Sequence, residues 1–205
     1  MDKGIILFDI DKTIFDTDKM VKAFDGKMMS ILGVSDFDYL KQAKEEYKKS
    51  LANERYFVPE SFCETLCERF NFDNQEALTD VFYGRNHAYI YKESVFPETY
   101  IVLDKLKDRF RFGIFSEGTA KFQNNKFRSM GLNKYFDENL IFIVEAKDTK
   151  EVIKKIPKSA VVVDDKESIC ELLVKNKIKT VWLNKTDSRV NPNFETIHSL
   201  LDLSL

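Results

Sequence analysis

The sequence has few cysteines, almost no net charge and no long hydrophobic run. Its three cysteines, an odd number, argue against a disulfide framework and indicate a reducing compartment. A formal net charge of −2 over 205 residues gives no general electrostatic attraction to nucleic acid or to a membrane. No apolar run approaches the roughly 20 residues that cross a bilayer. The sequence begins directly with a strand-like segment, so we expect no secretory signal. We therefore expect a cytoplasmic protein that binds neither nucleic acid polymers nor membranes.

The amino-terminal segment is the most informative part of the sequence. Four apolar residues, 5–8, lead into Asp9 and Asp11, and Thr13 follows two positions later. A continuous apolar run predicts a strand that is buried on both faces, as in a parallel sheet. Two carboxylates that meet at the end of such a strand repel each other, and a divalent cation with oxygen ligands relieves that repulsion. The alternative interpretation is a solvated turn with a helix cap.

The next part of the sequence is helical. Residues from about 17 to 94 contain no convincing strand. Ser35 and Asp38 resemble a capping box, and apolar residues follow at helical spacing to Leu51. Pro59 suits the first turn of another helix. We predict an insert of three or four helical segments.

Strands and helices alternate in the remaining sequence. Strands are expected at 111–115, 140–144, 160–163 and 179–183, and helices at 97–108, 119–130, 150–156 and 167–176, followed by a short carboxy-terminal helix. This alternation predicts an α/β fold with a doubly wound parallel sheet. We therefore expect a core domain of residues 1–16 and 95–205, with a helical domain of residues 17–94 inserted near its start.

Polar residues follow three of the five predicted strands. Asp9 and Asp11 follow the first strand, Ser116 follows the second, and Asp164 and Asp165 follow a run of valines. Each feature alone has a common structural explanation, because a serine before a helix is usually a cap. Parallel strands place their carboxyl ends at one edge of the sheet, where open α/β folds bind their ligands. The combined pattern therefore predicts a single site.

These motifs resemble those of the haloacid dehalogenase-like hydrolase superfamily, and the resemblance covers essentially the whole chain. Residues 9–13, Asp-Ile-Asp-Lys-Thr, match the first motif, Asp-x-Asp-x-Thr. Residues 115–118 resemble the second motif, and Asp164 with Asp165 resembles the acidic fourth motif. The resemblance implies a Rossmann-like core, and the helical insert is similar to the cap of the phosphoglycolate-phosphatase-like branch.

The third motif of this superfamily is a lysine near the start of a helix, and two residues fit it. Lys150 opens an apolar-patterned helix, so we favour it. Lys147 lies closer to the end of the preceding strand and is the alternative. A solvated run of charges is the competing explanation for both lysines.

The resemblance implies phosphoryl transfer through an aspartyl-phosphate. Asp9 is then the nucleophile and Asp11 the general acid and base. Mg²⁺ is the implied cofactor, with ligands from Asp9, Asp11, Asp165 and Asp164. The implied phosphate-binding group consists of Thr13, Ser116, Glu117 and Lys150.

Asp11 distinguishes two reactions within the superfamily. Family dehalogenases attack carbon and in general lack an acid two residues after the nucleophile, whereas a phosphatase needs one to protonate the leaving alkoxide. We therefore expect a phosphatase that acts on a phosphate monoester, with a small phosphorylated metabolite as its partner. The alternatives are a phosphomutase or phosphotransferase of the same family and a catalytically degenerate binding module. The sequence leaves the substrate and the oligomeric state open.

Overall fold

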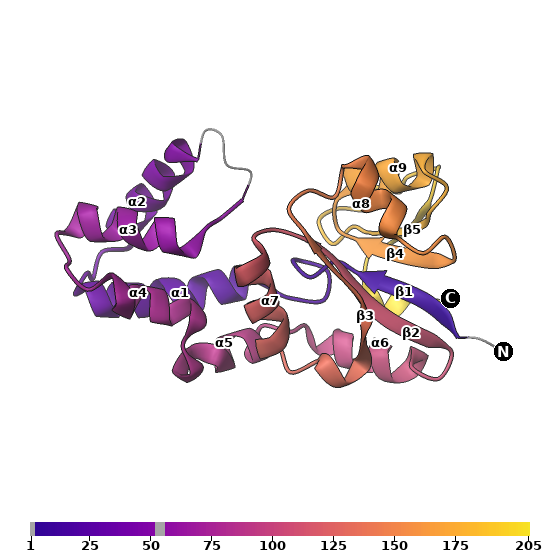
Figure 1. The fold of residues 1–205 in the computed structure, drawn as a ribbon, viewed down its shortest axis with the longest axis horizontal. Coiled ribbons are helices and arrows are strands. Elements are labelled where there is room, and N and C mark those ends of the chain that lie inside the picture. The colour runs from indigo at the N-terminus through magenta and orange to yellow at the C-terminus, as the bar shows by residue number, and fades with distance from the viewer. Residues whose placement is uncertain (1–2, 52–55) are drawn as a thin grey trace. The chain divides into compact units, whose positions relative to one another are not determined.

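The computed structural model describes residues 3–51 and 56–205. In this part of the chain a six-stranded sheet has the order β3-β2-β1-β4-β5-β6, and all its neighbouring strands are parallel (Figure 1). The strands are β1 (Gly4–Phe8), β2 (Phe110–Glu117), β3 (Phe136–Val144), β4 (Ala160–Asp164), β5 (Lys179–Leu183) and β6 (Glu195–Ile197). The prediction of a parallel α/β fold is confirmed.

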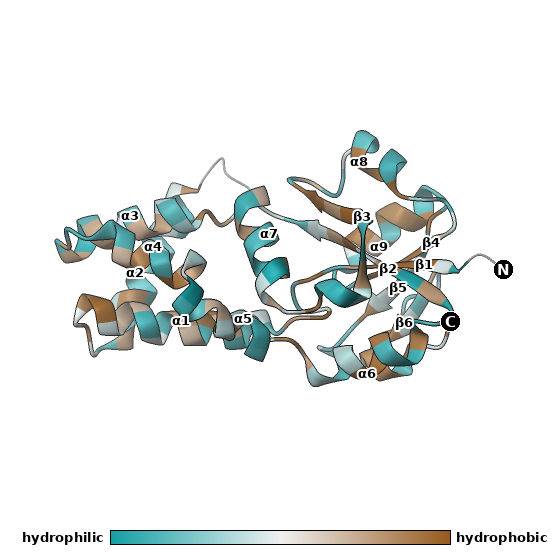
Figure 2. Cartoon of the chain, turned by 60° about the horizontal axis from the view of Figure 1, so that its bottom comes forward, coloured by the Kyte–Doolittle hydropathy of each residue, from teal (hydrophilic) through white to brown (hydrophobic). Residues whose placement is uncertain are grey.

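Helices cover both faces of this sheet. Helices α8 (Lys150–Lys155) and α9 (Glu167–Lys175) lie on one side, and α6 (Pro97–Leu106) lies on the other (Figure 1). Leu7, Phe115 and Val162 of the central strands pack in one apolar cluster with Ile153 of α8 and Leu173 of α9. The apolar strands stand out in brown between largely hydrophilic helix surfaces (Figure 2). Burial on both faces explains why these strands read as continuous apolar runs.

Two features of the sheet differ from the expectation. β3 begins at Phe136 rather than at 140, and its pairing with β2 is irregular between Phe112 and Ile114. Gly113 lies there, where a Cβ atom would collide with the backbone oxygen of Leu140. β6 was not predicted, because a strand of three residues is too short to show a periodic pattern. The expected carboxy-terminal helix is the 3₁₀ turn η3 (Leu200–Asp202).

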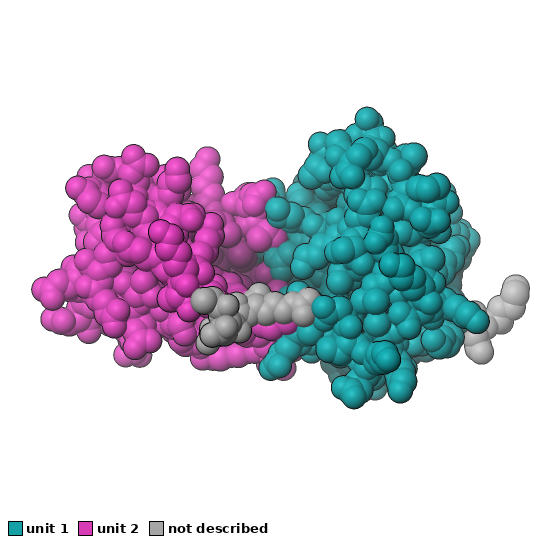
Figure 3. Space-filling view, turned by 90° about the horizontal axis from the view of Figure 1, so that it is seen from above, with its two compact units in different colours: residues 1–16, 95–117, 131–205 teal, residues 17–94, 118–130 magenta. Residues whose placement is uncertain are grey.

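The chain divides into two compact units, which Figure 3 shows in different colours. The sheet unit comprises residues 1–16, 95–117 and 131–205, and the helical unit comprises residues 17–94 and 118–130. The helical unit contains α1 (Thr17–Leu32), α2 (Phe37–Ser50), α3 (Pro59–Phe70), α4 (Gln75–Tyr83), the 3₁₀ turn η1 (Arg85–His87), α5 (Ala88–Glu93) and α7 (Ala120–Ser129).

Helix α7 groups with the helical unit, although the sequence suggested that it belongs with the sheet. Phe122 of α7 makes edge contacts with Phe57, Phe82 and Tyr91, with ring centroids 5.8, 5.9 and 6.5 Å away. Asn125 of the same helix donates a hydrogen bond to the Phe82 carbonyl. Periodicity marks the buried face of a helix but not the element against which that face packs.

Local signals for helix ends were correct to within one residue in two instances. α2 is capped by Asp36, whose carboxylate accepts a hydrogen bond from the Asp38 amide, rather than by Ser35. Pro59 occupies the first turn of α3, as expected.

Among the described residues, no helix combines the length and the hydrophobicity that a membrane span requires.

Candidate active site

The residues after β1 form a tight turn. The Asp9 amide donates to the Val163 carbonyl at 2.9 Å, which extends the pairing of β1 with β4 by one residue. The Lys12 amide then donates to the Phe15 carbonyl at 2.8 Å, and Lys12 adopts a left-handed conformation with φ of 59°. Asp11 is half-buried in this turn. The turn thus keeps both aspartates at the carboxyl end of a central strand.

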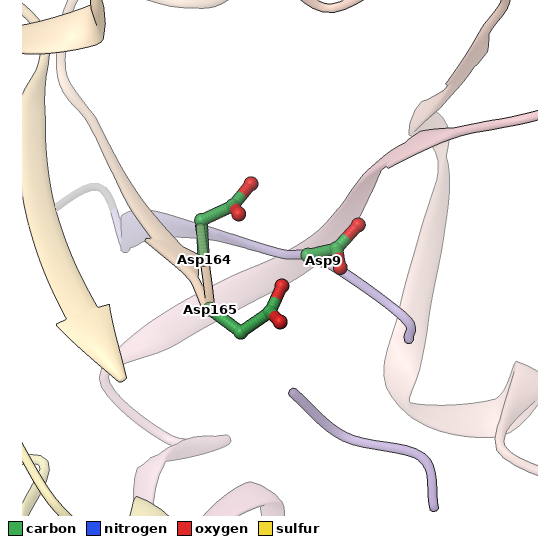
Figure 4. Close-up of side chains that lie close together, drawn as sticks. All are labelled: Asp9, Asp164 and Asp165. Atoms are coloured by element: carbon green, nitrogen blue, oxygen red, sulfur yellow. The ribbon is translucent and has the colours of Figure 1, made fainter. Parts of the chain in front are cut away.

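Three carboxylates converge at this edge of the sheet. Asp9 follows β1, Asp164 ends β4, and Asp165 comes next in the chain. One carboxylate oxygen from each residue lies within 4.8 Å of the others. Figure 4 shows the three side chains close together, with Asp164 and Asp165 extending toward the side on which Asp9 lies. Asp9 and Asp164 are buried, and Asp165 is partly exposed.

Lys147 neutralises part of this cluster. Its Nζ donates to Oδ1 of Asp9 at 2.7 Å and to Oδ2 of Asp164 at 2.6 Å. Only 1% of its side chain is exposed, and its ammonium lies 5.1 Å from the centroid of the Phe115 ring. The Lys147 amide donates to Oε2 of Glu117 at 2.9 Å. Hydrogen bonds therefore hold Lys147 at two places, its backbone amide and its side-chain ammonium group.

The structure brings Lys147, and not the preferred candidate Lys150, to the acids. Lys150 is the first residue of α8 and its side chain is exposed, whereas Lys147 is buried against the acids. The physical reason is the direction of the chain, because only two residues separate the end of β3 from Lys147, which keeps that lysine close to the sheet edge. Proximity to the end of a strand was the better signal, and the apolar pattern of the helix was the weaker one.

The ionisation of the cluster is shifted strongly. Burial raises the pKa of Asp9 to about 7, while Lys147 opposes the shift and Asp164 adds to it. Burial, followed by the charge of Asp164, raises the pKa of Asp165 to about 6. Burial disfavours the charged form of Lys147, but its two carboxylate partners outweigh that effect and hold its pKa above the usual value. The three carboxylates therefore carry more negative charge than the single ammonium group of Lys147 balances.

Two hydroxyl groups near the same strand ends are buried without hydrogen-bond partners. Ser116 of β2 is 1% exposed and Thr13 is fully buried. Within the described ranges, neither the Oγ of Ser116 nor the Oγ1 of Thr13 has a hydrogen-bond partner. Buried hydroxyls are normally paired, so orphaned ones indicate a ligand or ordered water.

The comparisons with known proteins agree with this geometry. A family model described as haloacid dehalogenase-like hydrolase matches residues 6–161. The chain belongs to the haloacid dehalogenase-like hydrolase family. No protein with curated annotation matches the sequence significantly.

Solved structures of this family share the fold. A haloacid dehalogenase-like hydrolase from Burkholderia xenovorans LB400 is 20% identical, with a TM-score of 0.73 over 98% of this chain and 95% of that chain. The hydrolase YfnB from Bacillus subtilis, solved bound to magnesium, is 18% identical, with a TM-score of 0.62 over 98% and 97%. The L-2-haloacid dehalogenase RSc1362 is 17% identical, with a TM-score of 0.50 over 98% and 96%.

The donor set of this family member fits a magnesium ion. The cluster contains three carboxylates and one ammonium group, which leaves two uncompensated negative charges when all are ionised. Carboxylate oxygens are the ligands that a hard divalent cation takes, and its two positive charges balance the excess. Burial is the main cause of the raised pKa values of Asp9 and Asp165, and the neighbouring Asp164 carboxylate adds to both shifts.

Apart from Asp11 in the turn after β1, the sequence-predicted site residues divide into four groups. Asp9, Asp164 and Asp165 come together, with Lys147 between the first two. Glu117 contacts the Lys147 backbone, and its Oε1 lies 3.7 Å from the ammonium of Lys166. The hydroxyls of Thr13 and Ser116 are buried and unpaired in the described part of the chain, and Lys150 lies apart on the surface.

One residue near the site was not predicted at all. Trp182 of β5 donates its indole N–H to the backbone carbonyl of Asp165 at 2.9 Å. The signal that points to it is the register of the sheet, because Trp182 is the β5 partner of Asp164. The sequence alone does not supply that register.

Proposed function

We propose that this protein is a magnesium-dependent phosphatase that hydrolyses a small-molecule phosphate monoester through an aspartyl-phosphate on Asp9. The observation that supports this proposal best is the carboxylate cluster of Asp9, Asp164 and Asp165, with Lys147 bound to two of its members. In this proposal the cluster supplies the nucleophile, the ligands of the cation and a fixed positive charge at one edge of the sheet. Phosphoryl transfer depends mainly on positioning and on electrostatic stabilisation of this kind.

Asp9 carries out the first step. One of its carboxylate oxygens attacks phosphorus, the new O–P bond forms, and the bond between phosphorus and the ester oxygen breaks. Asp11 gives its proton to the departing oxygen, so that the product leaves as an alcohol. Lys147 fixes the Asp9 carboxylate at 2.7 Å, which favours its ionised form despite its burial.

Asp11 reverses its role in the second step. As a carboxylate it takes a proton from a water molecule, whose oxygen attacks phosphorus. The bond between Asp9 and phosphorus then breaks, and inorganic phosphate and the free carboxylate are restored. Asp11 thereby regains the proton that it donated in the first step.

The remaining residues bind the metal and the phosphoryl group. Asp9 and Asp165, with Asp164 and the Asp11 backbone carbonyl, would hold Mg²⁺. When bound, the ion neutralises charge so that an anionic nucleophile can approach an anionic ester. The unpaired hydroxyls of Ser116 and Thr13 and the ammonium of Lys147 are the donors that we assign to the phosphoryl oxygens.

Asp11 favours a phosphate ester over a haloacid as substrate. A halide leaves from carbon without protonation, whereas an alkoxide leaves readily only when an acid protonates it. The family's members with solved structures include dehalogenases, so both reactions are chemically within reach of the fold. Of these two reactions, only phosphate-ester cleavage uses an acid two residues after the nucleophile.

We also propose a cellular compartment for this reaction and a role for each domain. Cys63, Cys67 and Cys170 are all free thiols, which suits a cytoplasmic enzyme that acts on a small phosphorylated metabolite. The inserted segment 17–94 is the region that we assign to substrate selection, as a cap next to the first motif. The core domain is then formed by residues 1–16 and 95–205, although α7 within this range groups with the helical unit.

Phosphate release from p-nitrophenyl phosphate and from a panel of phosphorylated metabolites tests the proposal. We expect turnover that requires Mg²⁺ and that Asp11→Asn reduces strongly. The matched control is Asp108→Asn, which removes an exposed aspartate that has no part in the cluster and should leave the rate unchanged. Failure across the panel by the folded protein, with or without release of halide from 2-haloacids, would contradict the proposed activity.

A further inference from the structure

Trp182 is the sole tryptophan of the chain, and it lies at the edge of the carboxylate cluster. The residue belongs to β5, is 3% exposed and pairs with Asp164 of β4 in the parallel ladder. Its indole N–H donates to the carbonyl oxygen of Asp165 at 2.9 Å. A buried indole needs a hydrogen-bond acceptor, and here the acceptor is the backbone of a residue that we assign to the metal.

The same peptide group is held from its other side. The amide of Lys166, which belongs to the peptide bond that follows Asp165, donates to Oδ1 of Asp164 at 2.9 Å. The carbonyl and the amide of this one peptide group are thus bound by Trp182 and by Asp164, respectively. Two such bonds fix the orientation of the peptide plane, and with it the backbone that carries the Asp165 carboxylate.

Within residues 3–51 and 56–205, this peptide lies outside the helices and strands. β4 ends at Asp164 and α9 begins at Glu167, so Asp165 and Lys166 lie between the two elements. Lys166 is the N-cap of α9 and makes no side-chain capping bond. Without the indole N–H, the Asp165 carbonyl would lose a partner that the ladder does not replace.

The loop after β5 holds the indole in place. The Phe194 ring meets it edge-on with centroids 6.5 Å apart, and the Arg189 guanidinium lies 5.6 Å from its centroid. Arg189 also lies 3.5 Å from Oε2 of Glu167 at the start of α9, and Asn191 donates to Oε1 of the same carboxylate at 2.9 Å. The loop after β5 is therefore bound by these contacts to α9, the helix that follows Asp165.

We propose that Trp182 is a positioning residue for the metal site, which acts by holding the Asp165–Lys166 peptide so that the Asp165 carboxylate faces the cation. This inference rests on the proposed function only in its assignment of Asp165 to the metal. Groups that orient metal ligands typically change metal affinity by about 10–100-fold when they are removed.

Trp182→Phe tests the role, because it keeps an aromatic ring in β5 and removes only the N–H donor and part of the indole. We expect its dissociation constant for Mg²⁺, measured by calorimetry, to rise by about tenfold or more. Saturating Mg²⁺ should restore kcat close to the wild-type value without a change in KM for the phosphate ester. The matched control is Tyr135→Phe, which also removes one aromatic hydrogen-bond donor, here the hydroxyl that donates to Asp104 away from the carboxylate cluster; its Mg²⁺ affinity should equal that of the wild type.

Tryptophan fluorescence gives a second measurement that needs no Trp182 variant. Since the indole contacts the Asp165 backbone, we expect Mg²⁺ to change the emission of the wild-type protein, and Asp165→Asn to abolish that change. Wild-type Mg²⁺ affinity in folded Trp182→Phe would overturn the inference and leave the phosphatase proposal standing. An emission that stays constant while calorimetry records Mg²⁺ binding would do the same. A protein that binds no Mg²⁺ at all would contradict both proposals.

Discussion

The ammonium of Lys147 lies 2.7 Å from a carboxylate oxygen of Asp9, although 138 positions separate the two residues in the sequence. The same ammonium lies 2.6 Å from Asp164, so a single lysine joins the ends of β1 and β4. All three side chains are buried. A buried charge that loses its partner costs about 3–5 kcal/mol, so the three residues are expected to depend on one another.

Lys147→Met and Lys150→Met provide a matched pair for this relationship. We expect Lys147→Met to lower the free energy of unfolding at pH 8 by about 3 kcal/mol, because Asp9 and Asp164 lose their cation. Phosphatase turnover should fall by about 10²–10³-fold, the usual loss for one donor to a developing charge. Lys150→Met should change stability by less than about 0.5 kcal/mol, since its side chain is exposed. Urea unfolding followed by circular dichroism and phosphate release measure both effects, and equal behaviour of the two variants would refute the assignment of Lys147.

Asp9→Asn separates chemistry from folding. The amide is nearly isosteric with the carboxylate but is not a nucleophile toward phosphorus, so turnover should disappear while the circular dichroism spectrum stays that of the wild type. The substitution also removes one negative charge from a cluster with an excess of them, so we expect no loss of stability in the absence of metal. A variant that retains the wild-type rate would exclude Asp9 as the nucleophile.

Mg²⁺ should stabilise the folded protein through the carboxylate cluster. Two unit charges about 4 Å apart interact by roughly 4 kcal/mol at an effective dielectric of 20, and a bound cation relieves such repulsion. We therefore expect saturating Mg²⁺ to raise the melting temperature, and Asp165→Ala to remove most of that increase. Differential scanning fluorimetry with and without Mg²⁺ measures the shift; Asp108→Ala is the control, and a metal-independent melting temperature counts against the site.

The pH dependence of this stabilisation follows from the raised pKa values. Asp9 titrates at about 7 and Asp165 at about 6 in the folded protein, both above the ordinary value of 3.8. Between pH 4 and pH 7 the folded state therefore binds more protons than the unfolded state, and the metal-free protein loses stability as the pH rises. Because Mg²⁺ must displace these protons, the increase in melting temperature with Mg²⁺ should grow from pH 5.5 to pH 8. An increase that is the same at both pH values would contradict the shifted ionisation.

The sequence predicted the parallel sheet because the strands are buried on both faces, and it predicted acids at the ends of β1 and β4 because those residues follow apolar runs directly. It did not predict which lysine reaches the acids. The helical pattern after Lys150 was a local signal, whereas the position of Lys147 depends on the path of the chain from β3 to α8.

Trp182 and α7 illustrate the same limit. The contact of Trp182 with Asp165 depends on the register between β4 and β5, which local periodicity does not encode. Phe122 marks the buried face of α7, but the aromatic rings that cover it come from residues about 30 to 65 positions earlier in the chain. The local sequence pattern determines where helices and strands lie and where they end. The long-range pairing and packing of these elements determines which side chains come into contact.

The covalent intermediate gives the most direct test of the central claim, that Asp9 receives the phosphoryl group. In Asp11→Asn the first step still proceeds with esters whose leaving groups need no proton, such as p-nitrophenyl phosphate, while the second step lacks its base. Acid quenching of this variant with that substrate and Mg²⁺, followed by peptide mass spectrometry, should find one phosphoryl group on Asp9. Phosphorylation of another residue, or a wild-type enzyme that releases phosphate while no phosphorylated peptide accumulates in the variant, would contradict the account.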